Sequence, residues 1–336
     1  MRENGRKLKA GLIGCGRIGT QKHIQAFVEN RSDIELVAVC DLVEEKAKKA
    51  ADIVEEKTGQ LPRVFTDHMQ LLQLPLDFVT IATESGYHHA VTMDALGAGK
   101  HVLVEKPMAL SVAHMDQMIQ SAKERNLRLG VCFQNRFNPP IQEVRKKIES
   151  GAFGRIFHVT ARILWNRNEE YYRQASWRGT RELDGGTLMN QCSHNIDLLQ
   201  WMVGAPVSSL HAVTRNFNHP YIECEDFGSA LLQFENGTVG IIEGTANVYP
   251  KNLEETLSIF GEKGTVVIGG LAVNRIQTWR FDGEEQHPFM ELPDPKTVYG
   301  NGHVPLFQDF VGAIQGGREP FVSGEEGKKA VEIILG

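Results

Sequence analysis

The sequence lacks paired cysteines. Its five cysteines, Cys15, Cys40, Cys132, Cys192 and Cys224, are widely spaced, and no two of them form a CxxC pair. An odd number at such spacing forms neither a disulfide framework nor a cysteine-based metal site, so we expect reduced thiols in a cytoplasmic protein and no metal. Cys192 lies close to His194 in the chain, but no second pair matches them, and ordinary packing is the simpler interpretation.

The chain also has no long hydrophobic run and no excess of positive charge. No apolar run approaches the roughly 20 residues that span a bilayer. Residues 1–5 lead directly into a strand pattern without a signal-peptide core. The net charge is -6, which argues against nucleic acid or a polyanionic membrane as a partner. The length of 336 residues suits two domains.

Strand and helix patterns alternate in the first part of the chain. The predicted strands are 8–14, 35–40, 78–82, 101–104 and 129–133, and the predicted helices are 18–29, 43–57, 88–96 and 111–125. Helices of this length between buried strands predict an α/β fold with a doubly wound parallel sheet.

The pattern changes after Asn138-Pro139-Pro140. One more helix, 141–149, precedes strands with few helices between them, at 156–165, 208–217, 231–243, 256–260 and 265–268. Asn236-Gly237 is a strong hairpin signal. This half therefore predicts an α+β domain with a mainly antiparallel sheet, followed by helices at 306–314 and 325–335. The helical pattern still runs at Gly336, which leaves open a continuation of the last helix in a longer native sequence.

A glycine-rich turn joins the first strand to the first helix. Gly14, Gly16 and Gly19 form a GxGxxG pattern around Arg17 and Ile18. In such a turn the first glycine permits a tight bend, the second lets a pyrophosphate approach, and the third packs helix against strand. The helix N-terminus adds N–H donors and a positive dipole. The pattern predicts a bound dinucleotide.

Asp41 ends the second strand, about 20 residues after the turn, where an acid binds the adenosine ribose hydroxyls. Leu42 and Val43 follow it, and no arginine stands ready for a 2′-phosphate. The predicted cofactor is therefore NAD rather than NADP. The alternative role of Asp41 is an N-cap of the helix that starts near Val43.

Glu105-Lys106-Pro107 follows the buried strand 101–104. The carboxyl end of such a strand points into the ligand crevice, so Lys106 is placed to reach a bound substrate. Asn190, His194 and Asp197 have the spacing of one helix face. That face is either solvated or part of a site, and Lys106 favours a site. A neutral imidazole can take a hydroxyl proton while an ammonium group stabilises the developing charge, and the two roles could be exchanged.

Together these segments resemble the glucose-fructose oxidoreductase / inositol dehydrogenase / rhizopine-catabolism (Gfo/Idh/MocA) family. The resemblance implies a Rossmann domain over 1–128 and a substrate-binding and oligomerisation domain over 129–336. The second domain would have an open-faced sheet that packs against another subunit of a homotetramer. The resemblance implies that Lys106 and His194 are catalytic. It also implies cofactor contacts from Thr83, His88, Glu105, Lys106 and Gln134.

Within the family, a closer resemblance is to the UDP-N-acetylglucosaminuronate 3-dehydrogenases of bacterial O-antigen and lipopolysaccharide biosynthesis. The matching residues include 134–139, 170–175, 177–180 and 184–191. This implies oxidation at C3 of a UDP-linked uronate, with nicotinamide recycled by 2-oxoglutarate. Two departures stand out. Asn190 replaces the aspartate that many members have four residues before the histidine, and Thr83-Glu84-Ser85 lacks the usual proline.

Arginines and aromatic residues alternate between residues 162 and 181 of this acidic chain. Guanidinium groups suit pyrophosphate and carboxylate, and aromatic rings can stack on uracil or sugar. The predicted substrate contacts are Lys106, Arg167, Tyr171, Tyr172, Trp177, Arg178, Asn190 and His194. The alternatives for this segment are a solvated charged loop or a subunit interface. The alternative activities are a dehydrogenase of free sugars or inositols and a non-catalytic dinucleotide-binding sensor.

Overall fold

The computed structural model describes residues 6–284, 286–293 and 300–336. The chain divides into two compact units, Met1–Phe133 with His303–Lys328 and Gln134–Gly302 with Lys329–Gly336. The expected entry of residues 1–5 into a strand lies outside the described residues. No helix of the described part is both long and apolar enough to cross a membrane.

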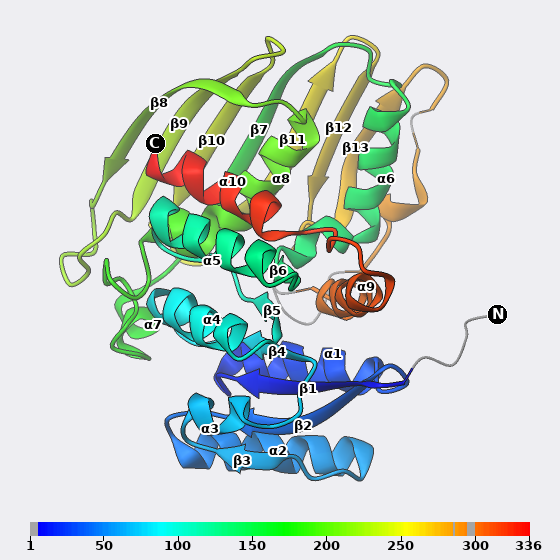
Figure 1. Ribbon diagram of the computed structural model, residues 1–336. Helices are drawn as coiled ribbons and strands as arrows, with labels where there is room; N and C mark the ends of the chain where they lie inside the picture. The colour runs from blue at the N-terminus through cyan, green and yellow to red at the C-terminus, as the bar shows by residue number, and fades with distance from the viewer. Residues whose placement is uncertain (1–5, 285, 294–299) are drawn as a thin grey trace. The chain divides into compact units, whose positions relative to one another are not determined.

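The first unit contains a sheet of six parallel strands (Figure 1). In chain order they are β1 (Leu8–Ile13), β2 (Ile34–Cys40), β3 (Arg63–Phe65), β4 (Phe78–Ile81), β5 (His101–Val104) and β6 (Leu129–Val131). Their order in the sheet is β3-β2-β1-β4-β5-β6, so the direction of winding reverses between β1 and β4. This confirms the Rossmann fold and places its ligand crevice at the carboxyl ends of those strands.

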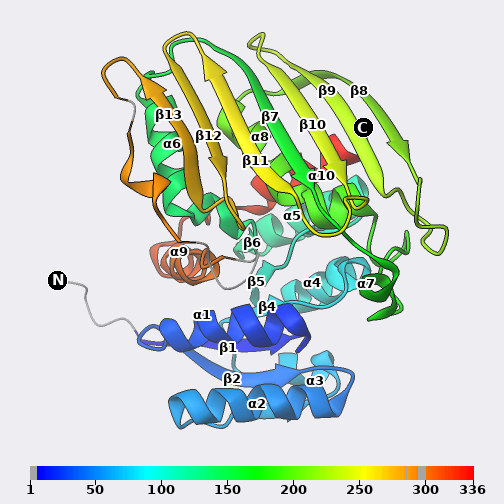
Figure 2. The same cartoon turned by 180° about the vertical axis from the view of Figure 1, so that it is seen from behind.

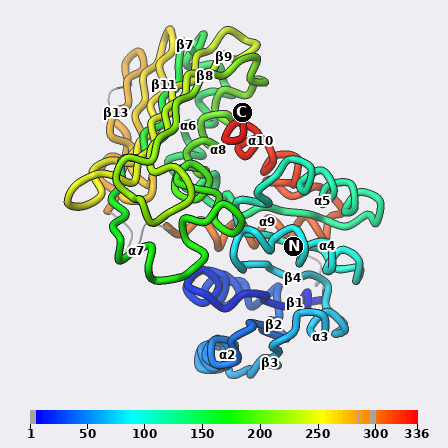
Figure 3. The backbone as a smooth tube through the Cα atoms, turned by 90° about the vertical axis from the view of Figure 1, so that its left-hand side faces the viewer, coloured from blue at the N-terminus to red at the C-terminus, as the bar shows by residue number. Residues whose placement is uncertain are grey.

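Helices cover both faces of this sheet, and Figure 3 shows α2 and α3 on opposite sides of β2. They are α1 (Ile24–Glu29), α2 (Glu44–Thr58), α3 (His68–Leu72), α4 (His88–Gly97), α5 (Val112–Glu124) and α9 (His303–Gly316), and α10 (Gly324–Leu335) follows α9. A π-helical turn, Gly19–His23, precedes α1. Ser111 caps α5, because its Oγ accepts a hydrogen bond from the His114 N–H at 3.3 Å.

The second unit contains a seven-stranded sheet in the order β13-β12-β11-β7-β10-β9-β8. The strands are β7 (Ile156–Leu164), β8 (Val207–Arg215), β9 (Phe227–Phe234), β10 (Val239–Thr245), β11 (Glu254–Gly261), β12 (Gly264–Gly269) and β13 (Arg275–Phe281). Its helices are α6 (Pro139–Glu149), α7 (Glu169–Arg173) and α8 (Ser193–Val203). Of the neighbouring strands, β7 and β10 pair in parallel and the rest are antiparallel, as expected.

Alternation along the strands gives this sheet one buried face. On β7, Val159, Ala161 and Ile163 are fully buried, and they face the side that α6 and α8 cover (Figure 1). Seen from behind, the strands stand in front of those helices, and none of the labelled helices crosses them (Figure 2). The predicted hairpin at Asn236-Gly237 is confirmed, with Gly237 at φ +82° between β9 and β10.

Several short elements were not predicted. They are β3, α3, α7 and the edge strand β13. The first compact unit also runs past residue 128 to Phe133, because β6 pairs with β5. It includes His303–Lys328 as well, where the Val322 carbonyl accepts a hydrogen bond from the Val131 N–H at 2.9 Å. The division of functions at residue 128 stays a prediction.

Candidate active site

The glycine turn lies directly after β1. Gly14 has φ +95°, and a Cβ there would lie 2.5 Å from the Ala82 carbonyl group, just after β4. A Cβ on Gly19 would collide with the Gly14 carbonyl oxygen, whereas nothing lies within 4 Å of a Cβ on Gly16. Close packing therefore requires Gly14 and Gly19, and Gly16 leaves open space in front of the helix that Arg17 and Ile18 begin. This cradle fits a dinucleotide pyrophosphate.

Asp41 braces the same turn. One carboxylate oxygen accepts a hydrogen bond from the Cys15 N–H at 2.9 Å, and the other accepts one from the Val43 N–H at 2.9 Å. Val43, not Asp41, is the N-cap residue of α2. The capping alternative is therefore wrong, and the carboxylate lies against the glycine turn. Binding of the ribose hydroxyls by Asp41 stays a prediction.

Lys106 follows β5 at the carboxyl edge of the sheet, and its N–H donates to Glu105 Oε2 at 3.1 Å. The other oxygen, Oε1, lies 3.0 Å from His23 Nε2 and 3.1 Å from His303 Nε2. Neither histidine Nδ1 has a partner among the described residues, so both rings donate from Nε2. Burial alone would raise the pKa of Glu105, but the two imidazole hydrogen bonds hold it well below its usual range.

His23, Glu105 and Cys132 form a set of buried donor atoms within 4.8 Å of one another. These atom types can bind zinc. Burial, with the neighbouring Glu105 carboxylate, raises the pKa of the Cys132 thiol well above its usual range. The Cys132 thiol also forms a hydrogen bond with Glu105, so the three side chains form one buried hydrogen-bonded cluster. The sequence hid this cluster because its members come from separate segments.

His88 connects two backbone segments at the same edge. It is 1% exposed, with Nδ1 2.8 Å from the Pro107 carbonyl oxygen and Nε2 3.1 Å from the Thr83 carbonyl oxygen. Burial lowers its pKa. A neutral ring has one N–H, and the shorter contact assigns that proton to Nδ1. His88 therefore donates to the Pro107 carbonyl oxygen, in the peptide that follows Lys106, and its ring lies beside the Thr83 carbonyl group just after β4.

In the second unit, a π-helical turn, Leu188–Cys192, leads into α8 and carries Asn190. Asn190 Nδ2 donates a hydrogen bond to Asp184 Oδ1, and Asp184 Oδ2 accepts one from the Gly179 N–H at 2.6 Å. A carboxylate therefore does contact position 190, although it comes from six residues earlier. Single-turn π-bulges often occur at functional sites.

His194 lies one residue into α8, and Gln134 Nε2 donates to its Nε2 at 3.3 Å. This nitrogen consequently carries a lone pair, as a proton acceptor requires. Asp197 does not join the group. It forms a buried ion pair with Arg136, at 2.8 and 2.6 Å, and both side chains are 1% exposed. The three polar residues expected on one helix face thus have three different partners.

The arginines between residues 162 and 181 fall into two groups. Arg162, Arg173 and Arg181 interact with glutamate residues. Arg167 and Arg178 instead lie against aromatic rings: Arg167 is 4.5 Å from the Trp165 ring centroid, and Arg178 is 4.3 Å from that of Tyr171. Trp177 lies on Arg178 at 4.7 Å. We call Trp165, Arg167, Tyr171, Trp177 and Arg178 the arginine–aromatic cluster.

Hydrogen bonds hold this cluster to the helix that carries His194. Arg167 Nε donates to Gln191 Oε1 at 2.9 Å, and Gln191 Nε2 donates to the Tyr171 hydroxyl at 3.0 Å. Arg178 Nη1 donates to the same hydroxyl at 2.5 Å. Tyr172 is buried behind it, with its ring 5.3 Å from that of His219. The hydroxyl of Tyr171 therefore joins two arginine-bearing segments.

Sequence reasoning missed three residues near these groups: Asp184, Gln191 and Glu255. Asp184 and Gln191 lie inside a stretch that matched the family, and their side chains had no assigned role. Glu255 lies on β11, and the positive charge of Arg167 lowers its pKa. No local sequence signal could have found Glu255, because the pairing depends on the register of β11 beside β7.

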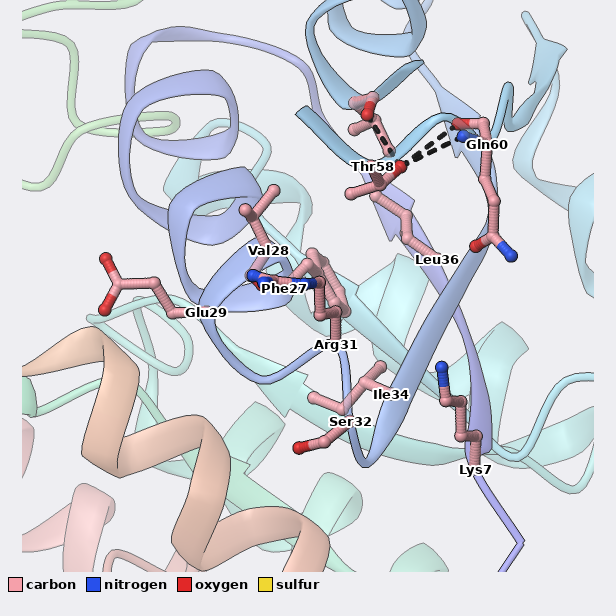
Figure 4. A pocket seen from close by; sticks show the side chains of 11 residues that line it. Lys7, Phe27, Val28, Glu29, Arg31, Ser32, Ile34, Leu36, Thr58 and Gln60 are labelled. Atoms are coloured by element: carbon pink, nitrogen blue, oxygen red, sulfur yellow. Dashed lines mark hydrogen bonds between the residues drawn. The ribbon is translucent and has the colours of Figure 1, made fainter. Parts of the chain in front are cut away.

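A cavity of about 500 Å³ opens elsewhere in the first unit (Figure 4). It is lined by Lys7, which precedes β1, by Ile34 at the start of β2, and by residues at the ends of α1 and α2, including Glu29 and Thr58. This is the amino edge of the parallel sheet, whereas cofactors bind at the carboxyl edge. The cavity is therefore not the cofactor site.

The predicted site residues thus form two groups, one in each unit. Four strand ends of the first unit carry Gly14, Gly16, Arg17, Ile18, Gly19, Asp41, Thr83, Glu105 and Lys106, with His88 behind them. The second unit carries Gln134, Arg167, Tyr171, Tyr172, Trp177, Arg178, Asn190 and His194. The first group can hold a dinucleotide and present an ammonium group. The second offers a proton acceptor and cations.

Comparison with known proteins finds one family match in each part of the chain. Residues 8–133 match the oxidoreductase family with an NAD-binding Rossmann fold, and residues 141–267 match the GFO/IDH/MocA C-terminal domain. The chain is 24% identical to the myo-inositol 2-dehydrogenase of Thermotoga maritima, over 98% of this chain and 94% of that protein.

Two solved structures are more similar in sequence. One is the WlbA dehydrogenase from Bordetella pertussis in complex with NADH and UDP-GlcNAcA, which is 41% identical, with a TM-score of 0.85 over 98% of this chain and 94% of that chain. The other is WlbA from Chromobacterium violaceum with the same two ligands, which is 36% identical, with a TM-score of 0.86 over 99% and 93%. The chain belongs to the GFO/IDH/MocA family and is an NAD-dependent sugar oxidoreductase.

Proposed function

We propose that this enzyme oxidises the C3 hydroxyl group of UDP-2-acetamido-2-deoxyglucuronate. The observation that carries the proposal is the arginine–aromatic cluster, in which Arg167 and Arg178 face aromatic rings rather than carboxylates. Two cations beside aromatic rings suit a ligand with a pyrophosphate, a carboxylate and a uracil ring. The WlbA dehydrogenases, solved with UDP-GlcNAcA, support it. The product would then serve O-antigen biosynthesis.

In the proposed reaction, His194 accepts the hydroxyl proton at Nε2. Neutral imidazole suits this step because its pKa lies near the working pH. Lys106 donates a hydrogen bond to the reacting oxygen and stabilises the negative charge that develops there. Asn190, held by Asp184, presents its amide carbonyl oxygen to the substrate.

The cofactor's nicotinamide ring supplies the acceptor for the hydride. The glycine turn and the N–H groups after it bind the pyrophosphate, and Asp41 binds the ribose hydroxyls. Thr83, His88 and Glu105 keep the surrounding strand ends in place, and Gln134 orients the His194 ring. With Lys106 these residues make up the proposed cofactor side of the site.

A steady-state assay tests the proposal. Purified enzyme should form NADH with UDP-N-acetylglucosaminuronate and turn over repeatedly when 2-oxoglutarate is added. UDP-N-acetylglucosamine, which lacks the carboxylate, and free myo-inositol serve as comparison substrates. Equal activity on free inositol would favour the free-sugar alternative, and no turnover with the uronate under either condition would rule the proposed substrate out.

We further propose a homo-oligomer, expected to be a tetramer, that forms through the uncovered face of the seven-stranded sheet. Leu231 and Ile241 are paired across β9 and β10, and they are 44% and 37% exposed. Val213 on β8 is 51% exposed. Apolar residues gathered on one face are typical of an interface. Ile241→Glu should lower the mass measured by light scattering, and an unchanged mass would argue against this face.

A further inference from the structure

One buried acid of the second unit has no part in the reaction described above. Glu255 is 8% exposed. Its neighbour Glu254 pairs with Arg162 at 2.9 Å, and successive strand residues point to opposite faces of a sheet. Glu255 therefore points to the face that α8 covers. There, its Oε2 has no hydrogen-bond partner among the described residues. Buried polar atoms without partners are rare and call for a physical explanation.

Arg167 is the charged group whose electrostatic interaction affects the pKa of Glu255. Burial raises the pKa of Glu255 to about 8, although the Arg167 charge and the Asn195 amide both lower it. Along the chain its titratable neighbour is Glu254, on the opposite face of the sheet, and on α8 His194 adjoins Asn195. Near neutral pH the carboxyl group is therefore protonated, and Arg167 stands beside an uncharged acid.

The partners of Arg167 are uncharged as well. Its Nε donates to Gln191 at 2.9 Å, and its Nη1 donates to the Asn166 carbonyl oxygen at 2.7 Å and to Asn252 Oδ1 at 3.2 Å. Within residues 6–284, 286–293 and 300–336, no carboxylate forms an ion pair with this guanidinium group, whose hydrogen bonds use Nε and Nη1. A half-buried cation without a counter-ion attracts an anion strongly.

We propose that Glu255 is a positioning residue that controls anion binding at Arg167. When Glu255 is protonated, the Arg167 guanidinium group is available to bind an oxyanion of the substrate, either a carboxylate or a phosphate. When Glu255 ionises, its O–H proton goes to solvent, and its negative charge repels that oxyanion. This inference rests on the proposed function, since it requires an anionic substrate. It predicts that anion affinity falls as Glu255 ionises.

The test measures binding of UDP-N-acetylglucosaminuronate to the full chain loaded with NADH, so that no hydride is transferred, by calorimetry at about pH 6.5 and about pH 9. We expect the affinity of the unaltered enzyme to fall about tenfold, equivalent to a coupling of about one pKa unit. Glu255→Gln should bind the uronate at both pH values with the affinity that the unaltered enzyme has at about pH 6.5. Glu254→Gln, which changes the neighbouring acid on the opposite face, should behave like the unaltered enzyme. Equal pH dependence in the unaltered enzyme and Glu255→Gln would overturn the inference.

A second probe separates this inference from the proposed substrate. If the uronate binds at neither pH, the substrate assignment fails, and sulfate replaces it because its charge is constant over this range. Sulfate should then raise the melting temperature more at the lower pH. That pH difference should disappear in both Glu255→Gln and Arg167→Gln. If Glu255→Gln retains the difference, Glu255 does not control the anion site.

Discussion

Two buried glutamates, one in each unit, have pKa values shifted in opposite directions because their surroundings differ. Glu105 lies among donors: His23, His303 and the Lys106 N–H all point to its oxygens. Glu255 has an oxygen with no partner among the described residues. Burial opposes the charge of both, yet the pKa of Glu105 lies well below its usual range and that of Glu255 is raised to about 8.

The difference shows that hydrogen-bond donors, rather than burial, decide whether a buried carboxyl group is charged. In the first unit, the donors come from the turn after β1, from β5 and from α9, so the charged Glu105 fixes the strand end that carries Lys106. In the second unit, an uncharged Glu255 leaves the charge of Arg167 unbalanced. We call the carboxyl edge of the first sheet, where these donors surround Glu105, the rigid edge, and we infer that the second unit leaves the charge of Arg167 for its ligand.

The largest effect should come from Lys106→Met, which removes the charge that the rigid edge presents. We expect turnover to fall about 10³- to 10⁴-fold, because the developing negative charge on the substrate oxygen loses its donor. NAD affinity, measured by fluorescence titration, should change little. Lys49→Met, an exposed lysine on α2, is the control. Retention of turnover in Lys106→Met would show that the catalytic assignment is wrong.

The next prediction concerns how much each of the two glutamates contributes to the stability of the folded chain. Glu105→Gln should lower the free energy of unfolding at neutral pH by roughly 2–4 kcal/mol, since hydrogen bonds to a charged group are lost. The contribution of Glu105 is present above its unfolded pKa of about 4.3 and is lost as pH falls through its lower folded pKa. Urea denaturation at several pH values would measure it, and an unchanged midpoint would show that the cluster is not stabilising.

Glu255 should behave in the opposite way. Its folded pKa is raised, so the folded chain holds the proton that the unfolded chain has lost, and stability declines as pH rises from about 4.5 to about 8. The decline should total roughly 3–5 kcal/mol. Glu255→Gln should remove this pH dependence, so its stability relative to the unaltered enzyme should increase at high pH. A parallel slope in both proteins would mean that Glu255 titrates normally.

The sequence predicted the first unit better than the second for a physical reason. The glycine turn, Asp41 and Lys106 each follow a strand of one parallel sheet, so local patterns are enough to bring them to one edge. Hydrophobic periodicity also gave most strands and helices. The shortest elements, β3 and α3, carry too few residues for a period to show.

The polar groups of the second unit depend on pairings that no local pattern contains. Arg167 and Arg178 were the predicted substrate contacts, but no local pattern shows that Arg162 and Arg173 pair with glutamates instead. The Asp184–Asn190 hydrogen bond and the position of Glu255 likewise depend on the loop before α8 and on the register of β11 with β7. The partner of Asp197 was missed for a related reason, because its buried pair with Arg136 joins segments 61 residues apart.

A smaller effect is expected from replacing an arginine of the second unit, and it tests which of these cations bind the substrate. Arg167→Gln should raise KM for the uronate about 30-fold, because a charge-assisted contact worth about 2 kcal/mol is lost. The kcat should change less than threefold if the contact is equally strong before and during the reaction, since uniform binding affects KM alone. Arg173→Gln is a matched control, because that side chain is 77% exposed and pairs with Glu169. Equal KM values in the two variants would remove Arg167 from the site.

The smallest effect should come from Asp41→Asn, which tests how much the rigid edge depends on charge. The amide keeps one oxygen to accept from the Cys15 N–H, so the turn should stay in place. It loses the second charged acceptor for a ribose hydroxyl, and we expect NAD affinity to fall about tenfold, or about 1.4 kcal/mol. NADP affinity should not fall, because the repelling charge near the 2′-phosphate is gone. Asp52→Asn, an exposed acid on α2, should change neither affinity. An unchanged NAD affinity in Asp41→Asn would mean that Asp41 only braces the turn, and that the charge at this edge resides in Glu105 and Lys106.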